Sequence, residues 1–395
     1  MPNLSNRTAL IKPSPTLTLD AKVKAMKAQG IGIINLSVGE PDFQTPDHIK
    51  EAAIKAIRDG FTRYTPSEGI PELREAISRK LSLDNSLSYN PSQIVVSNGG
   101  KHALYNIMQC LFQEGDEVII PTPYWVTYPD LVLLSGATPV FVPTYRQDGY
   151  ILRPDVLARV LTPRSRGLIL NSPSNPTGVV YSRENLKALA ETVAAADLWV
   201  ISDDIYEKLV YDQTPFVNLV MAAPELQSRV VIAHGVSKTY CMTGWRIGFL
   251  AGPEPLARAA AKLQSQMTSN PNSVAQKAAL AALEGPQECI DSLREAFGRR
   301  RNILVELLRK IPGVTCPEPK GAFYVFPDFS RHFGRTIGRV KIEKADDLAS
   351  VLLEECQVAT VPGSGFGEKR SIRLSYAASD DELRQGLERL TNLLI

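Results

Sequence analysis

Residues 230–251 read VVIAHGVSKTYCMTGWRIGFLA, which is two short apolar runs joined by a polar loop. The runs at 230–233 and 247–251 are typical of strands that are buried on both faces of a parallel sheet. The loop places Lys238 among small and apolar residues, where desolvation or a nearby cation would lower its pKa toward a nucleophilic free amine. Arg246 follows in the same loop and could neutralise a phosphate. Lysine is usually a solvated surface residue, so Lys238 alone decides nothing.

Five more short apolar runs precede this stretch, and helical patterns separate most of them. Helices that alternate with Val- and Ile-rich strands predict an α/β fold with a mostly parallel sheet covered on both faces. The five runs lie at 93–97, 117–120, 138–142, 167–170 and 198–202.

The pattern changes after a helical region at 254–310, where short strands and helices predict a smaller α+β unit. We therefore expect an N-terminal arm with part of the small domain at 1–46, a large domain at 47–290, and a C-terminal small domain at 291–395. The strands expected in the smaller unit lie at 321–326, 357–361 and 371–375.

The first 20 residues are rich in Pro and Ser and predict an extended arm. A helix is expected at 19–29, ending at Gly30 in a C-cap position. A short strand is expected at 31–36.

The composition excludes several classes of protein. The chain has 44 basic and 42 acidic side chains and a net charge of +2, which gives no electrostatic basis for a nucleic-acid or membrane partner. No apolar run approaches the roughly 18 residues of a membrane span, and the N-terminus lacks the apolar core of a secretory signal. The five cysteines and four histidines have no disulfide or metal-ligand spacing. We expect a cytoplasmic enzyme with reduced thiols and no metal.

Polar residues follow two of the predicted strands at the edge where ligands bind in open α/β sheets. Gly99 and Gly100 come before a helix, where backbone N–H groups and the helix dipole favour phosphate. A simple tight turn is the alternative interpretation. Asn175 lies between Pro173 and Pro176, and its amide could donate to a phenolate-type oxygen. An Asn-Pro turn with no such role is the alternative.

Acidic and basic residues occupy two further strand positions. Asp203 and Asp204 end one strand, where a carboxylate can pair with a protonated ring nitrogen. One of the two could instead cap the next helix. Arg373 lies inside an apolar strand and its planar fork suits a carboxylate ligand, unless it forms a structural ion pair with a protein acid.

Taken together, these five features indicate which ligand the site binds. They comprise an amine, an acid for a ring nitrogen, a donor to a ring oxygen, a phosphate cradle with an arginine, and an arginine for a carboxylate. This is the set of groups that pyridoxal phosphate and an amino acid require together.

At this point the sequence resembles the class I aminotransferases of fold type I, the aspartate aminotransferase family. The motifs that carry the resemblance run from Gly39-Glu-Pro-Asp-Phe43 through Asn175-Pro-Thr-Gly178 and Ser237-Lys238 to Arg373-Leu-Ser-Tyr376. Arg63-Tyr-Thr-Pro, Pro123-Tyr-Trp-Val and Ser269-Asn-Pro point to the prokaryote-type subgroup. The likeness covers nearly the whole chain.

The resemblance implies a role for each matching residue. Lys238 forms the Schiff base with pyridoxal phosphate and then moves the proton, and Asp203 pairs with the ring nitrogen. Asn175 and Tyr206 bind the ring hydroxyl oxygen, while Arg373 binds the substrate α-carboxylate under Gly39. Further implied contacts with the cofactor come from Gly99, Gly100, Lys101, Trp125, Ser237 and Arg246, and from Tyr64 of the second subunit of a homodimer with shared active sites.

The resemblance also implies the substrates, which are small amino acids and 2-oxo acids. L-Aspartate or L-glutamate with 2-oxoglutarate or oxaloacetate, in ping-pong kinetics, is the first expectation. A second carboxylate needs a further cation, for which Lys101 and the arm residues Lys12 and Thr16 are candidates. Family members that also accept prephenate carry this arm pattern, so prephenate is a further expected acceptor. Lys12 as a solvated arm residue is the alternative.

Two other functions are compatible with parts of the sequence. A carbon–sulfur lyase or a decarboxylase would use the same cofactor residues, because those residues serve the cofactor rather than the reaction. A cofactor-binding transcription regulator would carry an added DNA-binding domain, and only about 45 residues precede the large domain. Cys241 departs from the family, which usually has a small residue such as Ala, Gly or Ser there, and we expect slight repacking around it rather than lost activity.

Overall fold

A computed structural model describes residues 4–395. Its main element is a seven-stranded sheet with the order β2-β8-β7-β6-β5-β3-β4, in which β8 is antiparallel to both of its neighbours. The remaining pairs run parallel. The strands are β2 (Ile94–Ser97), β3 (Glu117–Thr122), β4 (Thr138–Pro143), β5 (Ser165–Asn171), β6 (Trp199–Asp203), β7 (Val230–Gly235) and β8 (Gly248–Ala251). All seven predicted strands are therefore confirmed, and so is the α/β fold class.

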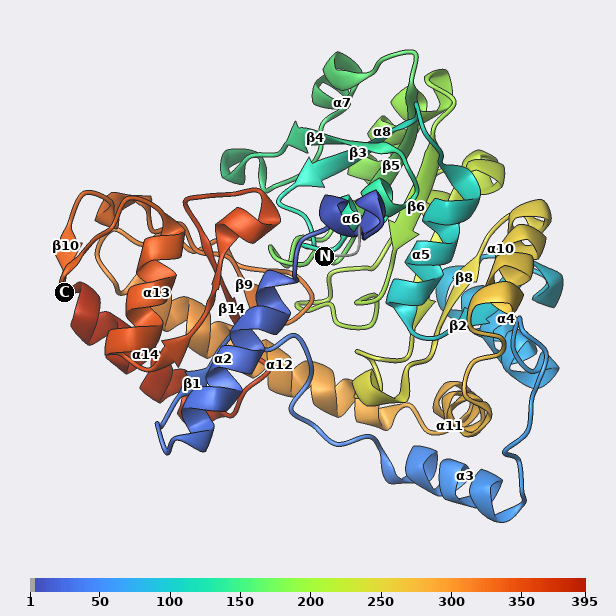
Figure 1. Ribbon diagram of the computed structural model, residues 1–395, viewed down its shortest axis with the longest axis horizontal. Helices are drawn as coiled ribbons and strands as arrows, with labels where there is room; N and C mark the ends of the chain where they lie inside the picture. Colours follow the sequence, from blue (N-terminus) through green and yellow to red (C-terminus); the bar gives the residue numbers. More distant parts are fainter. Residues whose placement is uncertain (1–3) are drawn as a thin grey trace.

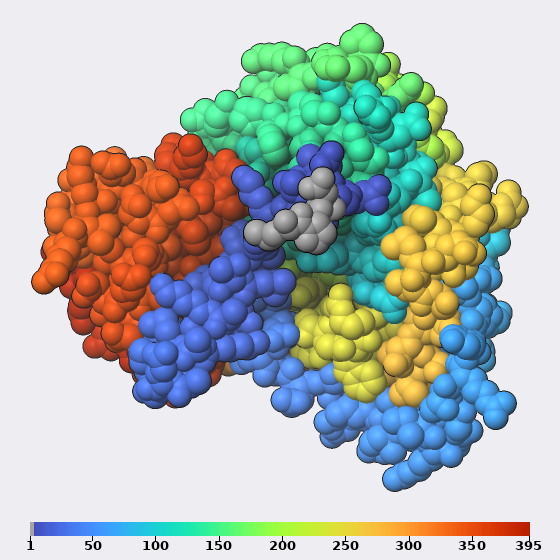
Figure 2. All heavy atoms as spheres, viewed as in Figure 1, coloured from blue at the N-terminus to red at the C-terminus, as the bar shows by residue number. Residues whose placement is uncertain are grey.

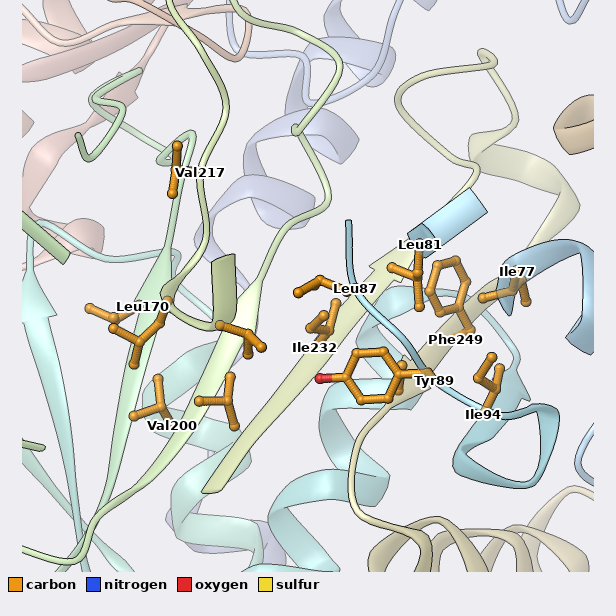
Figure 3. Packing of buried hydrophobic residues seen from close by; sticks show 14 of the residues in the cluster. Ile77, Leu81, Leu87, Tyr89, Ile94, Leu170, Val200, Val217, Ile232 and Phe249 are labelled. Carbon is orange, nitrogen blue, oxygen red and sulfur yellow. The ribbon is translucent and has the colours of Figure 1, made fainter. Parts of the chain in front are cut away.

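Helices cover both faces of this sheet (Figure 1) because alternate strand residues point to opposite sides. Val95 packs with α5 and α10, whereas Ile94 and Val96 pack with α4 and α11 on the other face. Figure 3 shows part of the core on the face of Ile94 and Val96, with Leu170, Val200 and Ile232 from three neighbouring strands. The helices of this part are α3 (Asp47–Arg58), α4 (Pro71–Asn85), α5 (Gly100–Leu111), α6 (Tyr128–Leu134), α7 (Pro154–Val160), α8 (Arg183–Ala195), α9 (Leu219–Ala222), α10 (Glu254–Met267) and α11 (Ser273–Glu284).

The long helix α12 (Glu288–Arg309) leads to a second, smaller unit, drawn in orange and red in Figure 1. Its three-stranded sheet has the order β13-β14-β9, and the N-terminal strand β1 (Ile34–Asn35) pairs with β12 of this unit. Residues near the N-terminus therefore pair with the C-terminal part of the chain. The elements are β9 (Tyr324–Val325), β10 (Thr336–Ile337), β11 (Val340–Lys341), β12 (Val358–Ala359), β13 (Val361–Pro362), β14 (Ile372–Ser375), α13 (Ala345–Glu355) and α14 (Asp380–Leu394).

The N-terminal arm is helical, so the prediction of an extended arm is wrong. Helix α1 (Asn6–Leu10) begins after Ser5, whose side chain accepts a hydrogen bond from the Arg7 N–H, and α2 spans Pro15–Ala28. Pro15 occupies the first helical position, where its fixed φ and missing N–H are no handicap. In Figure 2 the blue arm lies across the junction between the C-terminal unit and the sheet-bearing part.

Candidate active site

The carboxyl ends of the parallel strands meet at one edge of the main sheet. Asp203 is the last residue of β6, and Asn171 is the last residue of β5. Gly99 follows β2, and Lys238 lies in the loop that leaves β7. This edge is where open α/β sheets bind their ligands, so the topology brings the predicted site residues together.

Two glycines make room for an arginine at the N-terminus of α5. Gly99 has φ +87°, and a Cβ there would collide with the guanidinium of Arg246. A Cβ on Gly248 would collide with the backbone of Gly100, the first residue of α5. Arg246 has φ +58° and donates to the carbonyl of Thr243 at 2.8 Å. A helix N-terminus that faces a guanidinium is suited to an anion such as phosphate, which favours this interpretation over a simple turn.

An aromatic ring lies beside this cradle. The ammonium of Lys101 lies 5.0 Å from the ring centroid of Trp125, a cation–π distance. Trp125 meets the ring of Tyr128 edge-on, with centroids 5.3 Å apart. Desolvation and the charge of Arg246 lower the pKa of Lys101. Trp125 is half-buried, so part of its surface is free for a planar ligand to stack on.

Asp203 is a buried acid whose carboxylate accepts two hydrogen bonds. The Tyr128 hydroxyl donates to its Oδ2 at 2.6 Å, and the backbone N–H of Ile205 donates to its Oδ1 at 3.3 Å. Burial raises the pKa of Asp203, and these two donors oppose that rise. The result is a basic carboxylate, which is a suitable partner for a protonated ring nitrogen.

Asp204 does not cap a helix, so that alternative is wrong. The chain forms a turn at 205–208 instead of a helix. The Asp204 carboxyl accepts hydrogen bonds from Ser202 Oγ at 2.6 Å and Asn218 Nδ2 at 2.8 Å. Burial raises the pKa of Asp204 to about 8. These contacts give Asp204 a structural role.

Arg373 lies in β14, is only 2% exposed, and forms no ion pair with an acid in residues 4–395. Its guanidinium donates to Asn175 Oδ1 at 3.0 Å and to the carbonyl of Ser37 at 2.7 Å. Its buried Nε has no hydrogen-bond partner among residues 4–395. A buried guanidinium that retains an unused donor is able to bind a carboxylate ligand, and the structural ion pair is contradicted.

A chain of hydrogen bonds links Arg373 to the backbone of Asp203 through Asn175 and Asn171. The backbone N–H of Asn175 donates to Asn171 Oδ1 at 2.8 Å, and Asn171 Nδ2 donates to the Asp203 carbonyl at 2.9 Å. Asn175 Oδ1 accepts from Arg373, so its Nδ2 is the group available to a ligand oxygen. The geometry supports the predicted donor function of Asn175 over a plain Asn-Pro turn.

Lys238 extends into the same space. Its Nζ donates to the carbonyl of Gly39 at 2.5 Å and lies 5.9 Å from the ring centroid of Phe323. Burial lowers the pKa of Lys238 to about 8, and the positive charges of Arg246 and Arg373 add to this effect. Near neutral pH, the fraction of molecules in which the Lys238 amine is deprotonated is therefore larger than for an ordinary lysine.

Two tyrosines meet beside Arg373, Tyr206 from the turn after β6 and Tyr324 from β9 of the small unit. The hydroxyls of Tyr206 and Tyr324 share a hydrogen bond of 3.0 Å, and the Arg373 guanidinium lies 4.3 Å from the Tyr324 ring centroid. A Cβ on Gly39 would approach the Tyr324 hydroxyl to 3.5 Å. Ser237 is buried next to Lys238.

The arm residues lie near the rim of the site. Pro15 is close to Gly365, and α1 packs against α6. Burial raises the pKa of Asp130, while the backbone N–H of Lys12 and the charges of Lys12 and Lys101 oppose the rise. The two lysines therefore lie near one carboxylate. Thr16 lies in the first turn of α2, and its hydroxyl is 3.0 Å from that of Ser14.

Tyr64 lies apart from these residues, with 91% of its surface exposed. Three other residues belong to the site but were not singled out from the sequence, namely Tyr128, Asn171 and Tyr324. Asn171 directly follows an apolar run, which was a usable signal. The two tyrosines lie in apolar surroundings where a core tyrosine is the ordinary interpretation.

Comparison with known proteins decides the family. The family described as aminotransferase class I and II matches residues 31–390. The chain belongs to this aminotransferase family. It is 49% identical to an aspartate aminotransferase of Geobacillus stearothermophilus, over 98% of each chain. It is 50% identical to an aspartate/prephenate aminotransferase of Cereibacter sphaeroides, over 98% of this chain and 97% of that protein.

Solved structures give the same result for the aminotransferase fold. The aspartate aminotransferase from Rhizobium meliloti superposes with a TM-score of 0.96 at 42% identity, over 99% of this chain and 98% of that one. The Thermus thermophilus aspartate aminotransferase with maleate gives 0.94 at 41% identity, over the full length of both chains. The predicted family and its fold type are confirmed, and the cofactor of the family is pyridoxal phosphate.

The residues at the sheet edge fit this cofactor. A guanidinium and a helix N-terminus supply the phosphate end, in a cradle that a Cβ on Gly99 would fill. The basic carboxylate of Asp203 and the amine of Lys238 supply the two groups that the ring and its aldehyde require. The individual residue assignments stay predictions, to be tested by substitution.

Replacing Tyr128 with phenylalanine removes the hydroxyl donor to Asp203 without changing the packing of the ring. A hydrogen bond to a charged group contributes roughly 1.5–3 kcal/mol, so we expect kcat/KM of the aminotransferase to fall about tenfold or more. Steady-state kinetics measure this, with Tyr105→Phe on α5 as the control. Equal kinetics in wild type and Tyr128→Phe would contradict a functional hydrogen bond.

Proposed function

We propose that this aminotransferase moves the amino group between L-aspartate or L-glutamate and the oxo acids oxaloacetate and 2-oxoglutarate. The observation that carries the proposal is the buried, acid-free Arg373 with its unused Nε donor. Relatives that are 43–50% identical over nearly the whole chain are named aspartate or aspartate/prephenate aminotransferases, and they support the choice of a dicarboxylic substrate.

Each side chain has a defined task in this proposal. When bound, pyridoxal phosphate supplies an aldehyde that takes up amines and a ring that accepts an electron pair. Asp203 would hold a negative charge for the ring nitrogen, and Arg246 would hold a positive charge for the phosphate. Arg373 would bind and orient the α-carboxylate of the substrate. Lys238, whose pKa burial lowers to about 8, would hold the cofactor and would take up the Cα proton of the substrate as a free amine.

The reaction is tested by mixing the purified enzyme with L-aspartate and 2-oxoglutarate and measuring oxaloacetate and glutamate. Equal amounts of the two products, with parallel lines in double-reciprocal plots, are expected for a ping-pong transfer. Release of carbon dioxide without glutamate would instead establish decarboxylase chemistry, and release of pyruvate from a cysteine thioether in a parallel assay would establish carbon–sulfur lyase chemistry.

Arg373→Leu tests the carboxylate site. The variant loses a bidentate, charge-assisted contact of roughly 3 kcal/mol or more, so kcat/KM for aspartate is expected to fall at least about 100-fold. We expect cofactor affinity to change little, because β14 does not carry the phosphate cradle. Unchanged kinetics with aspartate would contradict the assignment.

Prephenate is the second candidate acceptor, and the arm supports it. Lys12 and Lys101 lie near the same carboxylate, Asp130, at the rim of the site. Lys12→Ala is expected to lower the rate with prephenate at least about tenfold more than the rate with oxaloacetate, which is about 1.4 kcal/mol of selectivity. Rates with the two acceptors that fall equally would leave Lys12 without a selective role.

The proposed assembly is a cytoplasmic homodimer with shared active sites. Tyr64, which would contact the phosphate of the partner subunit, projects from its own chain with 91% exposure. The domain division proposed with it is 1–46 with 291–395 as the small domain and 47–290 as the large domain. In residues 4–395, we find no helix that is long and apolar enough to cross a bilayer, and no cluster of three or more His, Cys, Asp or Glu side chains arranged for a metal. Sedimentation analysis tests the dimer.

A further inference from the structure

A buried charged cluster lies behind the turn that carries Asp203 and Tyr206. Its centre is Glu207, whose side chain is 3% exposed. The ammonium of Lys80 on α4 forms a salt bridge with Oε1, Asn85 Nδ2 donates to Oε2 at 3.1 Å, and His234 Nε2 lies 3.3 Å from Oε2. None of these four groups takes part in the chemistry described above.

The imidazole of His234 is oriented toward this carboxylate. The backbone N–H of Gly235 donates to His234 Nδ1 at 2.6 Å, and Nε2 is the ring nitrogen that faces the carboxylate. The ring stacks on Phe249 with centroids 5.2 Å apart and planes 9° apart. Phe249 belongs to the core in Figure 3. His234 lies in β7, and the loop that follows this strand carries Lys238.

Glu207 thus connects three segments that are distant in the sequence, namely α4, the turn at 205–208 and the end of β7. Within the turn, the N–H of Glu207 donates to the carbonyl of Asp204 at 2.9 Å. Burial alone would raise the pKa of Glu207, but Lys80 and His234 lower it well below its usual range. The carboxylate therefore stays charged, and it ties the turn to α4 and to the end of β7.

We propose that Glu207, held by Lys80 and His234, is a positioning residue that fixes the turn so that Asp203 and Tyr206 meet the pyridine ring of the cofactor. The proposal rests on the proposed function, because that function gives Asp203 and Tyr206 their places at the ring. Breaking a buried charge pair on one side leaves the other charge uncompensated, so the turn is expected to shift in Glu207→Gln.

The test compares Glu207→Gln with Glu117→Gln. Glu117 is a similarly buried acid with its own partners, Arg164 at 2.7 Å and Thr162 at 2.6 Å, but it lies at the opposite end of the sheet, at the start of β3. The cofactor is removed from each protein, and the dissociation constant of added pyridoxal phosphate, the circular dichroism of the bound cofactor, the thermal midpoint of the apoprotein, and kcat and KM for aspartate are measured.

For Glu207→Gln we expect a dissociation constant raised about tenfold or more, weaker cofactor dichroism and a lower kcat, with KM for aspartate within about twofold of wild type. Glu117→Gln should lose a comparable amount of thermal stability and keep the wild-type dissociation constant. A wild-type dissociation constant and dichroism in Glu207→Gln would overturn the proposal and leave the cluster with a purely structural role.

A second variant decides the matter if Glu207→Gln does not fold. His234→Phe keeps a ring on Phe249 but removes the Nε2 contact with Glu207 and the Nδ1 acceptor of the Gly235 N–H. A rise of about threefold in the dissociation constant is expected, and an unchanged constant would overturn the proposal. Wild-type protein that binds the cofactor but transfers nothing from aspartate would contradict the proposed function alone, since the comparison of dissociation constants would still hold.

Discussion

Lys238→Ala is expected to lower kcat for aspartate by about 10³-fold or more. The side chain supplies both the amine that holds the cofactor and the base that moves the Cα proton, and a positioned general base alone contributes roughly 10²–10⁴-fold. No other lysine among residues 4–395 reaches the Gly39 carbonyl that Lys238 contacts at 2.5 Å. Stopped-flow and steady-state assays on the same preparation measure the effect.

Lys262→Ala provides the control for this substitution. Lys262 is an exposed residue of α10, so its loss should change kcat by less than about twofold and stability by less than about 0.5 kcal/mol. A Lys238→Ala enzyme that retains more than a tenth of the wild-type kcat would show that another group moves the proton.

Asp203→Asn is expected to lower kcat about 10²–10³-fold, which is the usual cost of losing one preorganised electrostatic group. The amide keeps the shape of the side chain and can still meet the Tyr128 hydroxyl, but it carries no charge opposite the ring nitrogen. Steady-state kinetics and the dissociation constant of pyridoxal phosphate both report on this loss.

Asp204→Asn is the matched control for Asp203→Asn. Asp204 is equally buried but has a pKa raised to about 8, so it is largely protonated at neutral pH and an amide replaces a mostly neutral group. Its kcat should stay within about threefold of wild type. If the two variants lost activity to the same extent, the loss would come from damage to the turn, and the specific role of Asp203 would be contradicted.

The main sheet could be predicted from sequence because its strands are short Val- and Ile-rich runs, buried on both faces and separated by helices. Lys238 and Arg246 were recognisable because one loop carries both. The order of the strands in the sheet could not be predicted from the sequence, because it depends on pairings between segments far apart in the chain, such as β2 with β8.

The errors and omissions have local causes. The Pro-rich start was expected to be extended, but Pro15 is compatible with the first turn of α2. A helix cap at one of the two aspartates was a reasonable alternative, because no sequence signal shows that Ser202 and Asn218 engage the Asp204 carboxyl. Tyr128 gave no signal because its hydroxyl finds Asp203 only after two distant strands and α6 have packed together.

The central claim is that Lys238 binds pyridoxal phosphate in an aminotransferase that uses aspartate, and visible absorbance tests it most directly. The purified protein, with cofactor added, is measured before and after L-aspartate and again with L-glutamate. We predict a visible band that is bleached by either amino acid, with one oxaloacetate released per site from aspartate. A band that neither amino acid changes would contradict the substrate, and the absence of any band after adding the cofactor would contradict the role of Lys238.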